Sequence, residues 1–392
     1  MIENVKIRKL YKQLAERMML ISSAEAMETK GIHEKYWIKS GERSYLFKYN
    51  NHPKDYSDFG EVFVSYLSHV LGFKCVNSVF SQDFFYEERE KTHKVENYFK
   101  DKENAKSISQ QKGGSSAQNT KVSNFIGTGE KTTLCGKTMN PNESCETDRT
   151  YLRYGSLTES YIKNKNCEVF SLRALYSKFS PKKIGSGAIY DIVEVCKFFC
   201  ERYDIIMDNN LEAELKDMAL IDYLLVQEDR HGGNIEFLVE EKKGEKYLSL
   251  APMFDNGACL HLADNFKPEY ILEDLEKPIL YDIGIGKLNP TPAMYIKNNK
   301  RTLEKKDIIK DLANEILKDK RLGELYNNFK NLDISGEVEF LNSIYKRQLP
   351  NEYKKIINLS IKNRVDLLEK ELDLQKQRYM EELDDYECGF TL

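Results

Sequence analysis

The segment at residues 211–257 constrains the fold more than any other part of this 392-residue chain. A long amphipathic pattern at 211–228 predicts a helix, and the polar turn Asp-Arg-His-Gly-Gly-Asn follows at 229–234. Two strand patterns then flank the turn Lys-Lys-Gly-Glu, and the second strand leads into Asp-Asn-Gly at 255–257. The segment is therefore predicted to be a helix, a polar loop, a hairpin and a second polar loop.

Three side chains of this segment have the types and spacing that phosphoryl transfer requires. That reaction needs a carboxylate near the acceptor hydroxyl and oxygen ligands for a Mg²⁺ ion that bridges the phosphates. Protein kinases supply them from an Asp, an Asn five residues later and a second Asp after the next hairpin, which is the pattern of Asp229, Asn234 and Asp255. The Gly232–Gly233 pair permits a sharp turn, so the first two side chains are expected to face the same space. We therefore predict that all three residues are catalytic, that Asn234 and Asp255 bind the metal, and that the cofactors are ATP and Mg²⁺.

Such a site also requires a strand lysine that neutralises the ATP phosphates and a helix glutamate that holds this lysine. Lys48 closes the apolar strand pattern Ser-Tyr-Leu-Phe-Lys, and Glu61 stands at the start of the next helix pattern. Each residue alone is ordinary, because strand-end lysines and first-turn carboxylates are common. Their occurrence together, in the chain order of a kinase, makes Lys48 and Glu61 candidate ATP-binding residues.

Other residues near these motifs leave alternatives open. His231 is a further candidate for the ATP site, and it is equally suited to hold the loop by a hydrogen bond or to carry a proton. Arg230 by itself is best explained as a residue that caps and holds the end of the preceding helix. The stretch at 127–138 ends in Gly-Lys-Thr, but Lys131 stands where a P-loop requires glycine, so the P-loop pattern is not met.

The chain is expected to have an α+β fold in three parts. Residues 1–98 are predicted to form an N-terminal lobe that carries the ATP lysine, and residues 99–150 are polar and rich in Ser, Gln and Gly, which predicts a flexible insertion. Residues 151–392 are predicted to form a mostly helical C-terminal lobe with the catalytic loop and the metal-binding hairpin. The expected elements are a helix at 1–20, a hairpin at 35–50, a helix at 61–73 that stops at Gly72, a strand at 75–88, helices at 190–203 and 211–228, strands at 235–241 and 246–255, and helices between 303 and 387.

Charge and composition argue against several classes of protein. The net charge of −4 and a pI of about 6.0 argue against a protein that mainly coats nucleic acid or an anionic membrane, so no direct binding to either is expected. No apolar run is long enough to cross a bilayer, and the N-terminus lacks the apolar region of a secretory signal. The eight cysteines include no CxxC pair, which favours reduced thiols over a zinc site or disulfides. We expect a cytoplasmic protein, with secretion independent of a signal peptide as the alternative.

Four pieces of the sequence together resemble the HipA-like serine/threonine kinases of bacteria. They are Leu-Phe-Lys ending at Lys48, the Glu61 helix ending in Leu-Gly, LLVQEDRHGGN, and LAPMFDNG. The resemblance covers residues 31–82 and 185–265, and it implies an atypical, bilobal version of the protein-kinase and phosphoinositide-kinase fold with a small α+β N-lobe. The residue roles that it implies are a catalytic base at Asp229, Mg²⁺ ligands at Asn234 and Asp255, and a phosphate-binding lysine at Lys48.

The sequence also departs from the full-length members of that family. Those members carry an additional N-terminal subdomain that partners an antitoxin, whereas this sequence begins almost directly with the kinase lobe. The resemblance is therefore closer to the short members, which leaves an antitoxin partner in doubt. The loop that covers the phosphates ahead of the ATP lysine has no clear counterpart, and either the Ser40–Gly41 turn or residues 105–140 would have to replace it.

Together these features predict an ATP-dependent protein serine/threonine kinase that acts on a protein substrate. Autophosphorylation is a further possibility, because the polar insertion contains Ser107, Ser109, Ser115 and Ser116. A phosphoinositide-type lipid kinase is one alternative, because Asp-Arg-His-x-x-Asn is also the catalytic pattern of those enzymes. The acidic total disfavours it, since lipid kinases usually need a basic or amphipathic membrane surface. A non-catalytic nucleotide-binding scaffold is the other alternative, and the complete set of site residues disfavours it.

Overall fold

The chain of the computed structural model divides into two compact units, Met1–Asp83 with Tyr154–Leu392, and Phe84–Arg153. Only the ends of two strands are described in the second unit, so the predicted insertion at 99–150 lies outside the described residues apart from Thr150. The described residues are 2–17, 27–28, 35–40, 43–50, 55–86, 150–162, 166–179, 189–263, 267–277 and 305–388.

The first sheet has five strands in the order β1-β2-β3-β5-β4. The hairpin predicted for residues 35–50 is present, and its register places Tyr36 opposite Phe47 and Ile38 opposite Tyr45. Alternating large apolar residues of this hairpin bury one face of the sheet in a small core of its own, to which Phe47 and Leu157 contribute. The strands are β1 (Met27–Glu28), β2 (Lys35–Ser40), β3 (Arg43–Tyr49), β4 (Ser78–Tyr86) and β5 (Thr150–Glu159).

Strand β5 corrects one prediction. The pattern from residue 151 onward predicts the mostly helical C-terminal lobe, but residues 150–159 form a strand of the first sheet, antiparallel to β3. Gly155 pairs with Tyr49, and a Cβ atom at Gly155 would lie 2.0 Å from the carbonyl oxygen of Lys48, so no larger residue fits there. Because a strand is defined by its partner, and this partner lies about a hundred residues away in the chain, the local pattern does not reveal it.

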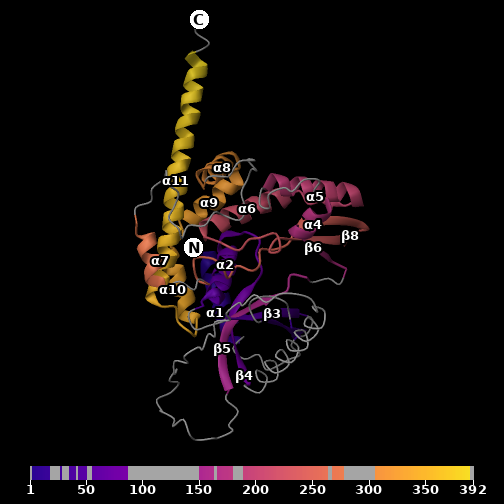
Figure 1. Cartoon of the computed structure of the whole chain (residues 1–392), viewed down its shortest axis with the longest axis vertical. Helices are drawn as coiled ribbons and strands as arrows, with labels where there is room; N and C mark the ends of the chain where they lie inside the picture. Colours follow the sequence, from indigo (N-terminus) through magenta and orange to yellow (C-terminus); the bar gives the residue numbers. More distant parts are fainter. Residues whose placement is uncertain are drawn as a thin grey trace, which may run out of the picture. The chain divides into compact units, whose positions relative to one another are not determined.

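Helix α2 (Ser57–Leu71) carries Glu61 and lies beside the first sheet (Figure 1). It begins four residues before the predicted start, so Glu61 lies in its second turn rather than at its start. Gly72 ends it with a φ of 83° and donates its backbone N–H to Ser68, as the sequence predicts. Helix α1 (Ile2–Arg17) packs against α2, where Tyr11 and Ser65 share a hydrogen bond of 2.8 Å between their hydroxyls.

The second sheet has four strands in the order β6-β8-β9-β7, and its central hairpin β8–β9 is the one predicted after the polar turn. Helix α6, predicted at 211–228, ends at Leu224, and a hydrogen-bonded turn at Leu225 and Val226 leads into the polar loop. Strands β6 and β7 and helix α4 were not among the predicted elements. The elements are β6 (Glu168–Ser171), β7 (Ile206–Met207), β8 (Glu236–Lys242), β9 (Glu245–Leu250), α4 (Leu172–Phe179), α5 (Ile189–Tyr203) and α6 (Leu211–Leu224).

The described residues from 267 onward are mainly helical; the sequence predicts the helices after residue 303, whereas α7 was not among the predicted elements. Asp319 and Asp333 cap two of these helices, because their side chains accept hydrogen bonds from first-turn backbone N–H groups. Within the described ranges, none of the helices combines the length and the apolar character that crossing a bilayer requires. The helices are α7 (Pro268–Leu275), α8 (Lys305–Lys318), α9 (Lys320–Lys330), α10 (Ile334–Ile344) and α11 (Asn351–Cys388).

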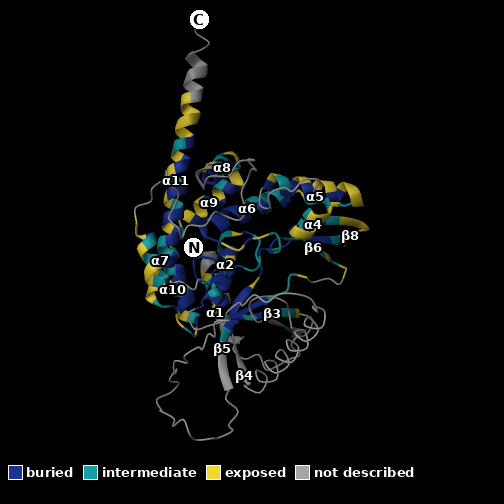
Figure 2. Ribbon diagram, viewed as in Figure 1, coloured by how far each residue is buried: buried dark blue, intermediate teal, exposed yellow. Residues whose placement is uncertain are grey.

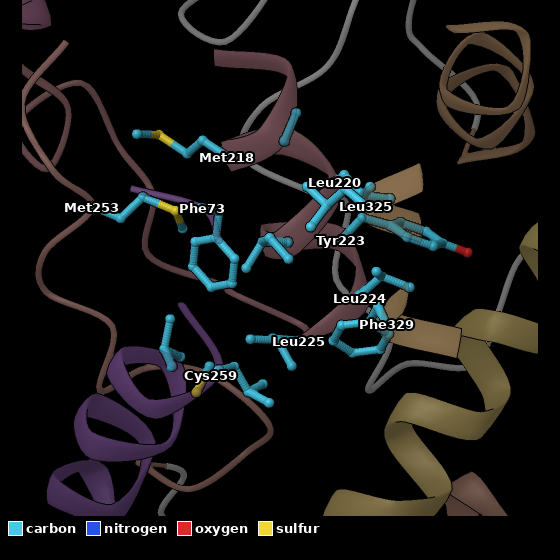
Figure 3. Packing of buried hydrophobic residues seen from close by; sticks show 14 of the residues in the cluster. Phe73, Met218, Leu220, Tyr223, Leu224, Leu225, Met253, Cys259, Leu325 and Phe329 are labelled. Atoms are coloured by element: carbon cyan, nitrogen blue, oxygen red, sulfur yellow. The ribbon is translucent and has the colours of Figure 1, made fainter. Parts of the chain in front are cut away.

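Helix α6 is the centre of the main hydrophobic core. Figure 2 shows the dark blue of buried residues continuing from α2 into the helices around α6. In the close view of Figure 3, side chains from α6, such as Leu224, lie among Phe73, Met253, Cys259 and Phe329, which come from four separate parts of the chain. Because α6 is held on all sides, the loop that follows it starts from a fixed point.

Candidate active site

Lys48 and two carboxylates form the centre of the site. The Lys48 ammonium on β3 lies 2.6 Å from Glu61 Oε1 on α2 and 2.7 Å from Asp255 Oδ1, which follows β9. Burial lowers the pKa of Lys48, but Glu61 and Asp255 together outweigh that effect and raise it above its ordinary value. The structure thus brings together three predicted residues from three separate elements, and Lys48 is held as a cation.

Glu61 connects the lysine to the backbone beyond Asp255. Its second oxygen, Oε2, accepts a 3.0 Å hydrogen bond from the backbone N–H of Asn256. Helix α2 approaches this segment closely, because a Cβ atom at Gly60 would lie 3.1 Å from Cys259 Sγ and one at Gly257 would lie 3.0 Å from Ser57 Cβ. A glycine on each side of the contact therefore lets the Glu61 carboxylate reach both of its partners.

The loop of Asp229 and Asn234 is held by its own hydrogen bonds. The side-chain Nδ2 of Asn234 donates to the carbonyl oxygen of Asp229 at 2.9 Å, and the backbone N–H of Asn234 donates to His231. The backbone N–H of Asp229 donates to Gln227 Oε1 at 3.0 Å. With its backbone fixed in this way, Asp229 presents a side chain that is 58% exposed. Such a carboxylate is accessible to the hydroxyl of an acceptor.

Arg230 ties this loop to the segment around Asp255. Its side chain is buried and pairs with Asp222 of α6, with 3.0 Å between Nε and Oδ2. It also donates to the carbonyl oxygen of Phe254 at 2.5 Å and to Asn256 Oδ1 at 2.6 Å. The sequence correctly indicates a structural residue here. The interpretation as a cap of the helix end is too narrow, because Arg230 joins α6 to both polar loops.

The backbone of Asp255 is strained. Its φ is +57°, in the left-handed region that residues other than glycine adopt infrequently and that Asp tolerates better than most. The carbonyl oxygen of Asp255 accepts a 3.4 Å hydrogen bond from Gln227 Nε2, so Gln227 touches both polar loops. Strain of this kind, held by surrounding contacts, is common at functional sites. Sequence reasoning missed Gln227, because a single glutamine at a helix end gives no signal of its own.

His231 holds the glycine turn. Its Nδ1 accepts a hydrogen bond of 3.0 Å from the backbone N–H of Gly233, and its Nε2 lies 3.7 Å from Asp229 Oδ1. Of the two possibilities that the sequence leaves open, the hydrogen bond that holds the loop is present. His231 does not line the cavity described next, and its role in ATP binding stays a prediction.

A cavity of about 530 Å³ opens beside Lys48. That volume is within the range of small-molecule sites, which are mostly apolar with a few polar groups at fixed places. Phe254 and Tyr161, whose ring centres are 6.0 Å apart, lie on its wall. The contribution of residues 160–162 was missed in the sequence, because it depends on strand β5. The lining residues are Trp37, Leu46, Lys48, Val76, Thr158, Glu159, Ser160, Tyr161, Ile162, Val169, Gly233, Asn234, Glu236, Phe254 and Asp255.

The donor set at the polar end of this cavity fits Mg²⁺ bound together with phosphate. Asn234 uses its amide nitrogen on Asp229, so its amide oxygen is the atom available to a cation. Asp255 adds a carboxylate, and both residues line the cavity. Mg²⁺ in kinase sites is bound through one or two carboxylates and the substrate phosphates rather than by an all-protein cage. The described residues contain no group of three His, Cys, Asp or Glu side chains that could hold a metal alone.

Among the comparisons with known proteins, only the comparison with solved structures supports the fold. No protein-family model and no curated protein matches the sequence. Among solved structures, the Helicobacter pylori proinflammatory kinase CtkA matches with a TM-score of 0.53 at 14% identity, over 91% of this chain and 98% of CtkA. The chain has a CtkA-like fold. The predicted α+β, HipA-like kinase fold is thereby confirmed, and with so little identity to CtkA the likeness extends to the fold only.

HipA is a second solved structure similar to this chain. The Shewanella oneidensis HipA, in complex with HipB and operator DNA, matches with a TM-score of 0.40 at 10% identity, over 93% of this chain and 70% of HipA. CtkA is thus matched over nearly its whole length and HipA over about two thirds.

Proposed function

We propose that this protein is an ATP-dependent protein serine/threonine kinase. The observation that supports it best is the pair of contacts that Lys48 makes with Glu61 and Asp255 beside a cavity of nucleotide size. A cation held by a helix glutamate and placed next to a metal-binding Asp is the arrangement that kinases use to bind the phosphates of ATP. The CtkA-like fold is consistent with this proposal.

The cavity suggests how the nucleotide would lie. Its apolar lining, with Trp37, Leu46 and Phe254, suits a flat aromatic base. Of its charged lining residues, which also include Glu159 and Glu236, Lys48 suits the phosphates directly and Asp255 suits them through a shared Mg²⁺. When bound, Mg²⁺ would neutralise the negative charge that the phosphates carry during transfer. Lys48 would orient the phosphates from the protein side, and Asn234 and Asp255 would hold the metal.

Asp229 is the residue proposed to act on the acceptor. Its exposed carboxylate would accept a hydrogen bond from the acceptor hydroxyl, orient it and take its proton as the phosphoryl group is transferred. The loop hydrogen bonds of Gln227 and Asn234 would keep this carboxylate at a fixed distance from the metal. The proposed acceptor is a serine or threonine of another protein, and the chain's own serines are included as candidates.

Phosphate transfer from ATP labelled in the γ position tests this proposal. Wild type is compared with Asp229→Ala and Asp255→Ala, first with Mg²⁺ and then with a chelator, and both self-labelling and a generic protein substrate are measured. Asp373→Ala is a matched control, because Asp373 is a surface carboxylate of α11 that pairs with Lys376 at 3.5 Å. We expect transfer by wild type and the control only, and only with Mg²⁺. A folded wild type that binds ATP and labels nothing would favour the non-catalytic scaffold.

A further inference from the structure

Arg173 lies directly against the glycine turn of the loop that carries Asp229. It is in the first turn of α4, and its backbone N–H donates to the carbonyl oxygen of Gly232 at 2.8 Å. Its guanidinium is on the same turn, because a Cβ atom at Gly233 would lie 3.8 Å from Arg173 Nη2. Arg173 is therefore held on the same loop that carries Asp229.

The Arg173 guanidinium is exposed, and its charge is not used within the described structure. The described residues include no ion pair and no side-chain hydrogen bond of Arg173, whereas Arg230 of the adjoining loop is buried in several. An exposed arginine presents a planar fork of N–H donors that matches a carboxylate. A charge of this kind at the edge of a proposed active site is available to an incoming molecule.

The cavity lining indicates which substrate Arg173 would meet. Gly233 and Asn234 line the cavity proposed for ATP, but Arg173, which packs on the same turn, does not. On that turn His231 connects Gly233 to Asp229, because it binds the Gly233 N–H and lies 3.7 Å from the Asp229 carboxylate. Arg173 therefore lies outside the cavity lining, on the turn that His231 connects to the Asp229 carboxylate.

We propose that Arg173 selects protein acceptors that carry an Asp or Glu close to the phosphorylated serine or threonine. This inference rests on the proposed kinase function and adds the chemical class of its substrate. An extended peptide advances about 3.3 Å per residue, so a carboxylate within two or three residues of the hydroxyl can reach Arg173 while the hydroxyl is at Asp229. Asp229 itself repels an acidic peptide, and the Arg173 cation offsets that repulsion.

Three peptides of one length test this inference, each with a single serine flanked by acidic residues, by alanines or by lysines. Two quantities are recorded. The first is transfer of phosphate from ATP to each peptide, and the second is binding of the fluorophore-labelled peptides in the presence of a non-hydrolysable ATP analogue. The proteins are wild type, Arg173→Ala, Arg173→Glu and the control Arg202→Ala, whose arginine lies exposed in the last turn of α5. Wild type and the control should prefer the acidic peptide about tenfold, the factor that about 1.4 kcal/mol produces.

The variants separate the role of Arg173 from the kinase activity itself. Arg173→Ala should remove the preference, Arg173→Glu should reverse it toward the lysine peptide, and neither should change the KM for ATP. An unchanged preference in Arg173→Glu, or a raised KM for ATP in Arg173→Ala, would overturn the inference. If wild type binds the acidic peptide with a preference that Arg173→Glu reverses, yet transfers no phosphate to any peptide or to itself, the kinase proposal fails, and only the recognition of acidic peptides by Arg173 stands.

Discussion

Lys48 makes two contacts of almost equal length with carboxylates of different exposure. The Glu61 side chain is 3% exposed and the Asp255 side chain 37% exposed. Glu61 is therefore the partner that depends on Lys48 for its burial as an anion, because a buried charge without a partner is costly. Asp255 can be solvated without it and is the partner that a metal can share.

The Lys48→Met substitution is expected to impair both folding and transfer. It leaves Glu61 buried without its cation, so the free energy of unfolding should fall by about 1–3 kcal/mol, and phosphate transfer should be lost. Chemical denaturation measures the first effect. Lys242→Met is the matched control, because Lys242 pairs with Glu240 at 3.1 Å on the surface and such pairs contribute about 0–1 kcal/mol. Equal losses in the two variants would contradict the structural role of Lys48.

The buried pair of Arg230 and Asp222 predicts a larger loss. Asp222→Asn keeps the side-chain shape but leaves the Arg230 charge buried without its anion, so the free energy of unfolding should fall by about 3–5 kcal/mol. Denaturant titration is the measurement. Asp366→Asn serves as the comparison, because Asp366 pairs with Lys362 at 3.0 Å on an exposed face of α11. A loss for Asp222→Asn as small as the loss for Asp366→Asn would show that Arg230 does not need its partner.

Helix α2 is anchored at its N-terminal end through a buried carboxylate. The hydroxyl of Tyr345, just after α10, donates to Asp58, with 2.8 Å to each carboxylate oxygen. Burial raises the pKa of Asp58 to about 6, and hydrogen bonds from Asn50 and Tyr345 oppose that rise. Because Asp58 precedes Glu61 by about one helical turn, this anchor helps to hold Glu61 against Lys48.

Tyr345→Phe is expected to destabilise the protein in a pH-dependent way. The raised pKa means that protonated Asp58 favours the fold, and that this contribution is lost as the pH rises through about 6. Above that pH the ionised carboxylate depends on Tyr345. The loss of unfolding free energy in the variant should be about 1.5–3 kcal/mol at pH 7.5 and about half as large at pH 5.

Thermal unfolding at the two pH values measures this difference. Tyr247→Phe is the matched control, because the Tyr247 hydroxyl donates to Glu245 at the surface of β9, with 2.6 Å between the oxygens. Its effect should be small and the same at both pH values. A loss in Tyr345→Phe that is the same at pH 5 and pH 7.5 would mean that Asp58 is not ionised at neutral pH.

The sequence predicts the elements that have strong local patterns. The hairpin β2–β3, helices α2, α5 and α6 and the hairpin β8–β9 all follow periodic apolar residues with glycine or polar turns at their ends. Short elements such as β7 and partner-dependent ones such as β5 lack such patterns. They were missed because long-range pairing, rather than local preference, determines them.

The predicted site residues illustrate the same limit. The order of the kinase motifs in the chain suggests that Lys48, Glu61 and Asp255 lie together. The structure places them in contact, although 207 residues separate Lys48 from Asp255. The motif could not reveal Gln227, Tyr161 or Arg173, whose positions depend on how loops pack. The predicted insertion at 99–150, including its four candidate serines, lies outside the described residues, and its roles stay predictions.

At the scale of the molecule, α2 is enclosed on several sides. All residues from Asp58 to Ser68 are buried. Helices α1 and α9 contact α2, and the Asn256–Gly257 backbone lies against its Gly60. A helix packed in this way cannot move Glu61 away from Lys48 without breaking several contacts. We therefore expect the ion pair of Lys48 and Glu61 to be formed before ATP binds.

The central claim is that one site, with Asp229 as its base, transfers the γ-phosphate of ATP. The most direct test is the rate of transfer by Asp229→Asn, measured beside its affinity for ATP. Asp229 does not line the cavity, so its substitution should leave ATP binding nearly unchanged while transfer falls by about 10²–10⁴-fold, the usual contribution of a general base. Transfer by Asp229→Asn at the wild-type rate would contradict the claim.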